Sequence, residues 1–215
     1  MKIEAVLFDC DGLMFDTEII AQEMLRELGR NYGVEIPDAF IMAITGANLK
    51  NVEANFPELA PILEESKQYR FDLNFWKSIH TDCLNKEGLL ELFAYLETNG
   101  YKVAICSSSG RDYVETVMGT TSIPLHYDAI VCGDMVKEVK PNPEIFLTAS
   151  ALLKVKPENC LVLEDSKNGI LAARNAGMHN CFIEDTIGKD EEMAQNIEFE
   201  CANLREVIAL LERVS

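Results

Sequence analysis

The chain has 215 residues, of which 48% are hydrophobic, and its formal net charge is −17. This length suits one α/β domain, or a core domain that carries a smaller insertion. The negative charge argues against nucleic acid and anionic membrane surfaces as partners. The sequence contains no apolar run of about 18 residues, so we expect no transmembrane helix. A phosphate site on such a chain has to be built locally, from a metal ion and a few placed cations.

The first predicted strand, Ile3–Phe8, is followed directly by Asp9-Cys10-Asp11-Gly12. Two carboxylates this close repel each other unless a cation or a proton lies between them. Parallel sheets carry their chemistry at the carboxyl ends of strands, which is where these acids lie. Asp and Gly are also common in turns, so the pair taken alone leaves a simple turn open.

Residues 17–85 are predicted to form a helical insertion. Ala21, Met24, Leu25 and Leu28 have helical spacing, and the separation between the first two strands is far longer than a usual crossover. We expect a core domain of residues 1–16 and 86–215 and a cap domain of residues 17–85. Beside the acidic turn, the cap would act as a lid, with hinges near Asp16–Thr17 and Asn85–Gly88; a purely structural second domain is the alternative. Substrate specificity would lie in the cap, whose candidate residues are Phe40, Asn48, Lys50, Lys67, Tyr69, Arg70 and Trp76.

Four further strands are predicted after the insertion, each followed by a helical pattern: Lys102–Cys106, Ala129–Cys132, Cys160–Leu163 and Asn180–Ile183. This alternation predicts an α/β fold with a parallel sheet wrapped by helices. The expected helices include Leu89–Asn99, Gly169–Ala176, one that begins at Asn142-Pro143, and a C-terminal helix behind Asn203 with the apolar stripe Leu204, Val207, Ile208 and Leu211.

Polar residues follow three of the later strands. Ser107, Ser108 and Ser109 follow the second, Lys140-Pro141 comes after the third, and Glu164-Asp165-Ser166 follows the fourth. In a parallel sheet they gather beside Asp9 and Asp11, and such a set suits a divalent metal next to a phosphate. Ser107 is preferred over Ser108 as the phosphate ligand, Ser109 is expected to cap a helix, and Glu164 and Asp165 could cap the helix near Lys167, although at least one should bind metal.

Several of these runs form an ordered series. Asp9-x-Asp11-Gly12-x-Met14-x-Asp16-Thr17-Glu18, a serine after the second strand, Lys140-Pro141-x-Pro143 and Glu164-Asp165-Ser166-x-x-Gly169 resemble the four motifs of the haloacid dehalogenase superfamily, in particular its phosphatase and β-phosphoglucomutase-like branch. The resemblance implies a Rossmann-like core with a helical cap. It also implies a magnesium ion (Mg2+) held by the Asp9 carboxylate, the Asp11 backbone carbonyl and Asp165. Glu164 would either bind the metal directly or contact the residues that bind it.

Physical chemistry assigns the same residues to a phosphoryl transfer. Asp9 is the expected nucleophile, because a carboxylate can form an aspartyl-phosphate. Asp11 would give a proton to the leaving alkoxide and take one from the attacking water. Ser107 and Lys140 would meet the charge on the phosphoryl group. The prediction is a Mg2+-dependent phosphatase that hydrolyses a small phosphorylated metabolite, with sugar phosphates first.

Other interpretations are weaker. A cysteine phosphatase built on Cys106 and Arg111 would have a phosphate cradle one residue short, and a phospho-acceptor signalling module would carry neither Asp11 nor a helical lid. A sugar phosphomutase of the same branch has a cap histidine where this chain has Ala21, and an arginine after a cap glycine where Leu49 follows Gly46. Haloacid dehalogenases lack an acid at the position of Asp11, so dehalogenation is not expected.

The predicted cellular setting is a reducing one. The seven cysteines form no Cys-x-x-Cys pair and three lie in or beside strand-like runs, while the N-terminus lacks an apolar signal region. These features predict a cytoplasmic protein without structural zinc. A monomer is compatible with an active-site lid.

Overall fold

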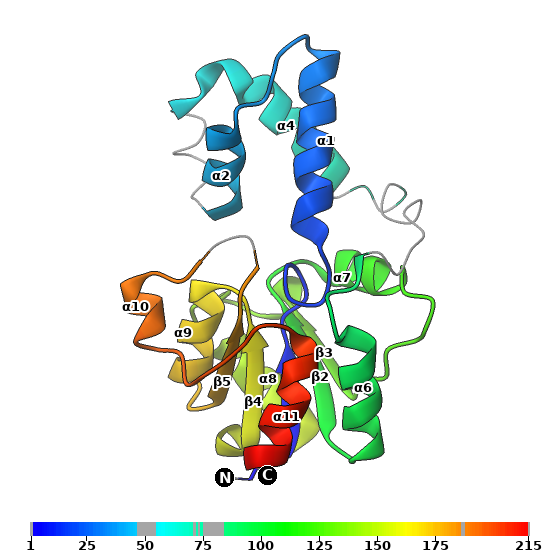
Figure 1. The fold of residues 1–215 in the computed structure, drawn as a ribbon, viewed down its shortest axis with the longest axis vertical. Helices are drawn as coiled ribbons and strands as arrows, with labels where there is room; N and C mark the ends of the chain where they lie inside the picture. The colour runs from blue at the N-terminus through cyan, green and yellow to red at the C-terminus, as the bar shows by residue number, and fades with distance from the viewer. Residues whose placement is uncertain are drawn as a thin grey trace.

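A six-stranded parallel sheet forms the centre of the molecule (Figure 1). The computed structural model describes residues 2–46, 55–70, 72, 74, 84–185 and 188–214. The strand order is β3-β2-β1-β4-β5-β6. The strands are β1 (Ala5–Phe8), β2 (Lys102–Ser107), β3 (Ala129–Cys132), β4 (Cys160–Glu164), β5 (His179–Ile183) and β6 (Phe199–Cys201). The predicted α/β fold with a parallel sheet is therefore confirmed.

The sheet contains one strand that the sequence did not predict. β6 is only three residues long, Phe199–Cys201, and places the exposed Glu200 between its two apolar residues. So short a run carries no apolar pattern, and its pairing with β5 is what makes it a strand. The five predicted strands are all present, although β1 begins at Ala5 rather than Ile3 and β5 at His179 rather than Asn180. β2 and β4 extend one residue further than predicted, so Ser107 and Glu164 are the last residues of their strands.

Helices cover both faces of the sheet. Every residue of β1 is buried, with Val6 and Phe8 facing one apolar cluster and Ala5 and Leu7 the other, as expected of a strand covered on both faces. The first cluster includes residues of α6 (Leu89–Thr98), α7 (Arg111–Met118) and α11 (Leu204–Val214), and the second includes residues of α8 (Glu144–Leu153) and α9 (Lys167–Asn175). Shorter helical elements are Gly133–Met135, Pro157–Asn159 and α10 (Glu191–Ala194).

The helix starts follow local capping chemistry. Pro143, not Asn142, occupies the cap position of α8, which begins one residue later than expected, at Glu144; Asn142 Oδ1 still accepts from the Glu144 N–H at 2.9 Å. Asn203 Oδ1 accepts from the Glu206 N–H at 3.1 Å, which confirms the predicted cap of α11. Ser166 Oγ accepts from the Gly169 N–H at 3.1 Å at the start of α9. Ser166, rather than Glu164 or Asp165, is therefore the cap of that helix.

The segment between β1 and β2 contains helices with an apolar cluster of their own. They are α1 (Thr17–Asn31), α2 (Asp38–Gly46), a short turn at Pro57–Leu59 and α4 (Ala60–Arg70), and Figure 1 shows α1, α2 and α4 grouped apart from the sheet. Their cluster comprises Leu25, Leu28, Ile36, Phe40, Ile41, Leu59, Ile62 and Leu63.

One proposed specificity residue belongs to this cluster. Phe40 is fully buried and its ring packs edge-on against that of Phe56, 5.3 Å between centroids. Its suggested role in substrate choice is therefore wrong: it stabilises the helical segment. Asn48, Lys50 and Trp76 lie outside the described residues, as do the side chains of Lys67, Tyr69 and Arg70. Among the described helices none is both long enough and apolar enough to cross a membrane.

Candidate active site

The predicted site residues meet where the central strands end. β1 lies between β2 and β4, and the strand order changes direction at this point. Such a switch point opens a crevice at the carboxyl edge of a sheet. Asp9 follows β1 and its N–H donates to the Leu163 carbonyl at 3.1 Å, while Ser107 and Glu164 end the neighbouring strands.

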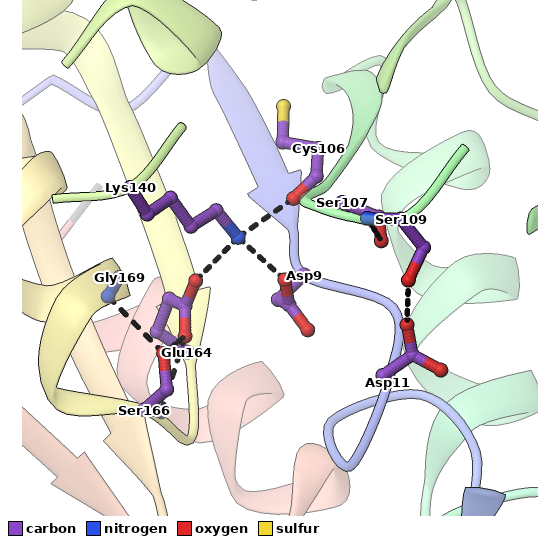
Figure 2. Close-up of polar contacts among 9 residues, drawn as sticks. All are labelled: Asp9, Asp11, Cys106, Ser107, Ser109, Lys140, Glu164, Ser166 and Gly169. Atoms are coloured by element: carbon purple, nitrogen blue, oxygen red, sulfur yellow. Dashed lines mark hydrogen bonds and ion pairs between the residues drawn. The ribbon is translucent and has the colours of Figure 1, made fainter. Parts of the chain in front are cut away.

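Lys140 joins two acids at this edge (Figure 2). Its Nζ donates to Asp9 Oδ1 at 2.5 Å, to Glu164 Oε1 at 2.6 Å and to the Cys106 carbonyl at 2.8 Å. The ammonium also lies 5.1 Å from the centre of the Phe146 ring. All three charged side chains are buried, so one cation is shared between two carboxylates in a medium of low polarity. The sequence placed Lys140 beside a phosphoryl group; its partner in the structure is the predicted nucleophile.

Glu164 uses both carboxylate oxygens within the protein. Oε1 accepts from Lys140, and Oε2 accepts from the backbone N–H and the hydroxyl of Ser166 at 3.1 and 2.9 Å. A buried carboxylate satisfied in this way is held in one orientation. Glu164 thereby fixes the position of Lys140.

The site carries more negative charge than Lys140 balances. Burial raises the pKa of Asp9 to about 7, with Glu164 and Asp11 adding to the effect and Lys140 opposing it. Burial, together with Asp9, Glu164 and Asp185, raises the pKa of Asp165 well above its usual range. Burial disfavours the charge on Lys140, but Asp9 and Glu164 outweigh it and raise the pKa of that ammonium. This arrangement favours the arrival of a further cation.

Asp11 is surrounded by hydroxyl groups. Thr17 Oγ1 and Tyr113 Oη donate to its Oδ1 at 3.1 and 2.7 Å, and Ser109 Oγ donates to its Oδ2 at 2.9 Å. The prediction that Ser109 caps a helix is wrong, because Gly110 occupies the cap position of α7 and Ser109 turns toward Asp11 (Figure 2). Tyr113 was not among the predicted site residues. It lies on the apolar face of α7 and is 6% exposed, so its pattern indicates only a core residue.

Ser107 lies at the end of β2 and is 1% exposed. Its Oγ accepts from the Ser109 N–H at 3.0 Å, which leaves the hydroxyl hydrogen to be donated elsewhere. The preference for Ser107 as a phosphate ligand stays a prediction.

Asp165 lies close to the turn that carries Asp11. Gly12 has a φ of +78°, and a Cβ there would lie 2.4 Å from Asp165 Oδ2 and 3.0 Å from Asp185 Oδ2. A second acid at this edge, Asp185, was not predicted because it follows β5 without a recognisable motif. It forms an ion pair with Lys86, whose Nζ also contacts Asp16 Oδ1 at 2.8 Å.

The donor set fits a hard divalent cation. Within the described ranges, no three His, Cys, Asp or Glu side chains already form a metal cage. Mg2+ does not need one, since it is bound through one or two carboxylates and otherwise by water and substrate phosphate oxygens. Asp9 and Asp165 are two such carboxylates, and Gly12 leaves room for the second.

The cysteine-phosphatase interpretation does not fit this geometry. In Figure 2 the sulfur of Cys106 points away from Lys140 and Asp9. Burial raises the pKa of this thiol far above its usual value, and a nucleophilic cysteine needs the opposite. Arg111 Nε donates to Glu115 at 2.8 Å on the helix surface.

Fold and site together define a class, a doubly wound α/β protein with a cluster of acidic side chains at its switch point. Residues 6–183 match the family model of the haloacid dehalogenase-like hydrolases, and the chain belongs to that family. The resemblance recognised in the motifs is thereby confirmed, and the protein is an enzyme of this hydrolase family.

Known proteins of similar sequence and structure agree with this assignment. The chain is 32% identical over 189 residues to a phosphorylated carbohydrates phosphatase of Thermotoga maritima, with 84% of each chain covered. It is similar to the crystal structure of CbbY from Rhodobacter sphaeroides in complex with phosphate, with a TM-score of 0.73, 27% identity, and 95% and 96% of the two chains covered. The β-phosphoglucomutase structure from Clostridium difficile has a TM-score of 0.72 at 23% identity, with 98% of this chain and 96% of that one covered, and supports the fold.

Proposed function

We propose that this hydrolase is a Mg2+-dependent phosphatase that cleaves a small phosphomonoester through an aspartyl-phosphate on Asp9. The observation that carries the proposal is the buried contact of Asp9 with Lys140, at the sheet edge where Asp11 and Asp165 also lie. One relative of the chain is named a phosphorylated carbohydrates phosphatase, so sugar phosphates are the first substrate class to test.

Two residues carry out the proposed bond changes. A carboxylate oxygen of Asp9 attacks phosphorus, and the bond to the leaving oxygen breaks. Asp11 protonates that leaving oxygen as a general acid and then, as a general base, takes a proton from the water that hydrolyses the aspartyl-phosphate. Asp9 leaves the cycle as it entered, and the products are an alcohol and inorganic phosphate.

The proposed Mg2+ ligands are the carboxylate of Asp9, the backbone carbonyl of Asp11 and the carboxylate of Asp165. A bound magnesium ion supplies positive charge beside the transferring phosphoryl group. Both oxygens of Glu164 are already hydrogen-bonded, so we place Glu164 behind Lys140 rather than on the metal.

Lys140 and Ser107 are the proposed phosphoryl ligands of the protein itself. Lys140 is held by Asp9 and Glu164, so its charge is in position before the substrate arrives and needs no reorganisation. Ser107 ends the strand next to β1 and can donate its hydroxyl hydrogen to a phosphoryl oxygen.

We propose that residues 17–85 form the cap domain of a core made of residues 1–16 and 86–215. Two connecting segments run side by side, because the Asp16 N–H donates to the Leu84 carbonyl at 2.8 Å and the Lys86 N–H donates to the Met14 carbonyl at 2.9 Å. The proposed hinges at Asp16–Thr17 and Asn85–Gly88 coincide with this pair. Limited proteolysis and scattering with and without a metal-bound phosphate mimic test the motion, and an unchanged cap position would contradict it.

Phosphoryl re-transfer by a sugar phosphomutase is the main competing activity. Ala21, on α1, offers no group to exchange a proton with a sugar hydroxyl, which favours hydrolysis. A phospho-acceptor signalling module would retain the phosphoryl group for long periods. The cytoplasmic location and the monomeric state stay predictions.

Phosphate release from a panel of phosphorylated sugars and p-nitrophenyl phosphate tests the proposal. The wild-type enzyme is assayed with Mg2+ and with chelator, beside Asp9→Asn and Asp11→Asn. We expect metal-dependent release that both variants lose. A long-lived, acid-labile phosphate on Asp9 of the wild-type enzyme, without phosphate release, would instead indicate a mutase or a signalling module.

A further inference from the structure

The three hydroxyl groups around Asp11 are divided unequally between its two oxygens. Oδ1 accepts two hydrogen bonds, from Tyr113 at 2.7 Å and from Thr17 at 3.1 Å, whereas Oδ2 accepts one, from Ser109 at 2.9 Å. In water, the carboxylate of an aspartate rotates freely about its two side-chain bonds. These contacts on both oxygens fix its rotation.

Two of the donors belong to the sheet domain. Ser109 follows β2, and Tyr113 lies in the first turn of α7. The ring of Tyr113 is packed in the apolar cluster that covers one face of the sheet, so its hydroxyl is held in place from behind. Thr17 is the first residue of α1 and lies at the proposed hinge. Tyr113 therefore keeps its place relative to the sheet whatever the helical segment does.

We infer that Tyr113 is a positioning residue for Asp11: its hydroxyl holds Oδ1 and so leaves Oδ2, the oxygen with a single contact, to exchange a proton with the reacting groups. The inference rests on the proposed phosphatase function. Oδ1, with two incoming hydrogen bonds, is the oxygen that the protein holds. Oδ2 has the single contact with Ser109, whose hydroxyl can turn and accept instead of donate.

The proton balance follows from this assignment. As the bond from Asp9 to phosphorus forms, the bond from phosphorus to the leaving oxygen breaks, and that oxygen takes the proton from Asp11 Oδ2. Asp11 is then a carboxylate, which Tyr113 and Thr17 stabilise through Oδ1. In the second step water attacks phosphorus and its proton returns to Oδ2, while the bond to Asp9 breaks. Tyr113 never gives up its own proton.

The choice of leaving group separates this role from a structural one. An alkyl phosphate needs a proton on its leaving oxygen, but p-nitrophenolate leaves without one. Tyr113→Phe removes only the hydroxyl and keeps the packed ring. We expect it to lower kcat/KM for the best alkyl phosphate of the panel about 10-fold, which is part of the roughly 100- to 10,000-fold that general acid catalysis contributes. For p-nitrophenyl phosphate the expected loss is under about twofold.

The matched control is Tyr127→Phe, at a position that is 37% exposed and outside the site, and it should leave both kcat/KM values unchanged. Equal losses on the two substrates, or no loss from Tyr113→Phe, would overturn the inference. Should that variant unfold under assay conditions, Thr17→Val removes the other donor to Oδ1 and is measured in the same way. If Asp9→Asn still releases phosphate, the proposed function itself fails; an inactive Asp9→Asn with equal Tyr113→Phe losses rejects only the role of Tyr113.

Discussion

The backbone of Gly169 faces the carboxylate of Glu164 so closely that a Cβ at this position would lie 1.8 Å from Glu164 Cδ. Helix α9 begins at Lys167, so its first turn passes directly over the acid that holds Lys140. Only a residue without a side chain allows this approach. The glycine is therefore part of the support for the charged centre.

Gly169→Ala should lower both stability and activity. The added methyl group must displace Glu164 or the start of α9, and overpacking of this kind costs about 3 kcal/mol. Denaturant unfolding measures the loss. Gly110→Ala is the comparison variant, because a Cβ there has no neighbour nearer than Asp134 Oδ2 at 3.9 Å, and it should lose only the glycine cap of α7, about 1 kcal/mol. Equal stability of the two variants would contradict the close approach.

A second pair of glycines tests the metal site without an activity assay. Gly12 and Gly33 both have positive φ, +78° and +67°, but only a Cβ on Gly12 meets Asp165. Both alanine variants should lose about 1 kcal/mol from the backbone conformation. Saturating Mg2+ should raise the Tm of wild type and Gly33→Ala by about 5 °C, and chelator should reverse the shift. The increase in Tm caused by Mg2+ should be small or absent in Gly12→Ala and in Asp165→Asn. If both variants show the same increase as wild type, Asp165 is not a metal ligand.

Asp11→Asn should separate the two halves of the proposed reaction. With p-nitrophenyl phosphate the first half needs no general acid, so the variant should give a burst of about one p-nitrophenolate per enzyme. The second half needs a base to take a proton from water, so phosphate release should stop after that burst. Rapid-mixing absorbance follows the burst, and mass spectrometry detects the phosphate retained on Asp9. Steady turnover by Asp11→Asn would show that another group is the base.

The stability of the fold should depend on the charge of Asp128 at low pH. Its carboxylate accepts from Lys102 Nζ at 2.6 Å and from the Val103 N–H at 2.9 Å; burial opposes the charge, but these contacts hold the pKa of Asp128 below its usual range. A lowered pKa stabilises the folded protein above the unfolded-state pKa of about 4, and this contribution is lost as the pH falls through the folded-state pKa.

Comparing Asp128→Asn with wild type measures this contribution. The pair is exposed, so after allowance for solvent screening we expect Asp128→Asn to cost about 0.5 kcal/mol at pH 7. The difference between the two proteins should shrink below pH of about 4. Lys102→Met should show part of the same loss, because it keeps the bond from the Val103 N–H. A difference that grows as the pH falls would have the wrong sign.

The sequence alone determined the sheet and the residues at its carboxyl edge. Apolar runs such as Val103–Cys106 and Leu161–Leu163 predict strands because burial on both faces demands continuous apolar residues. The parallel order then requires Asp9, Ser107 and Glu164 to end near one another. β6 escaped because a strand as short as Phe199–Cys201 depends on its neighbour rather than on its own pattern.

Only the tertiary structure decided which of these groups touch. Ser109 has the sequence context of a helix cap, yet its hydroxyl donates to Asp11, and the core residue Tyr113 brings its hydroxyl to the same carboxylate. Both contacts join residues about a hundred positions apart in the chain. Local propensity carries no information about such pairs, because packing of α7 against the sheet sets where each side chain ends. The local sequence therefore determines which reactive residues follow the strands, and the tertiary fold determines the orientation of the Asp11 carboxylate.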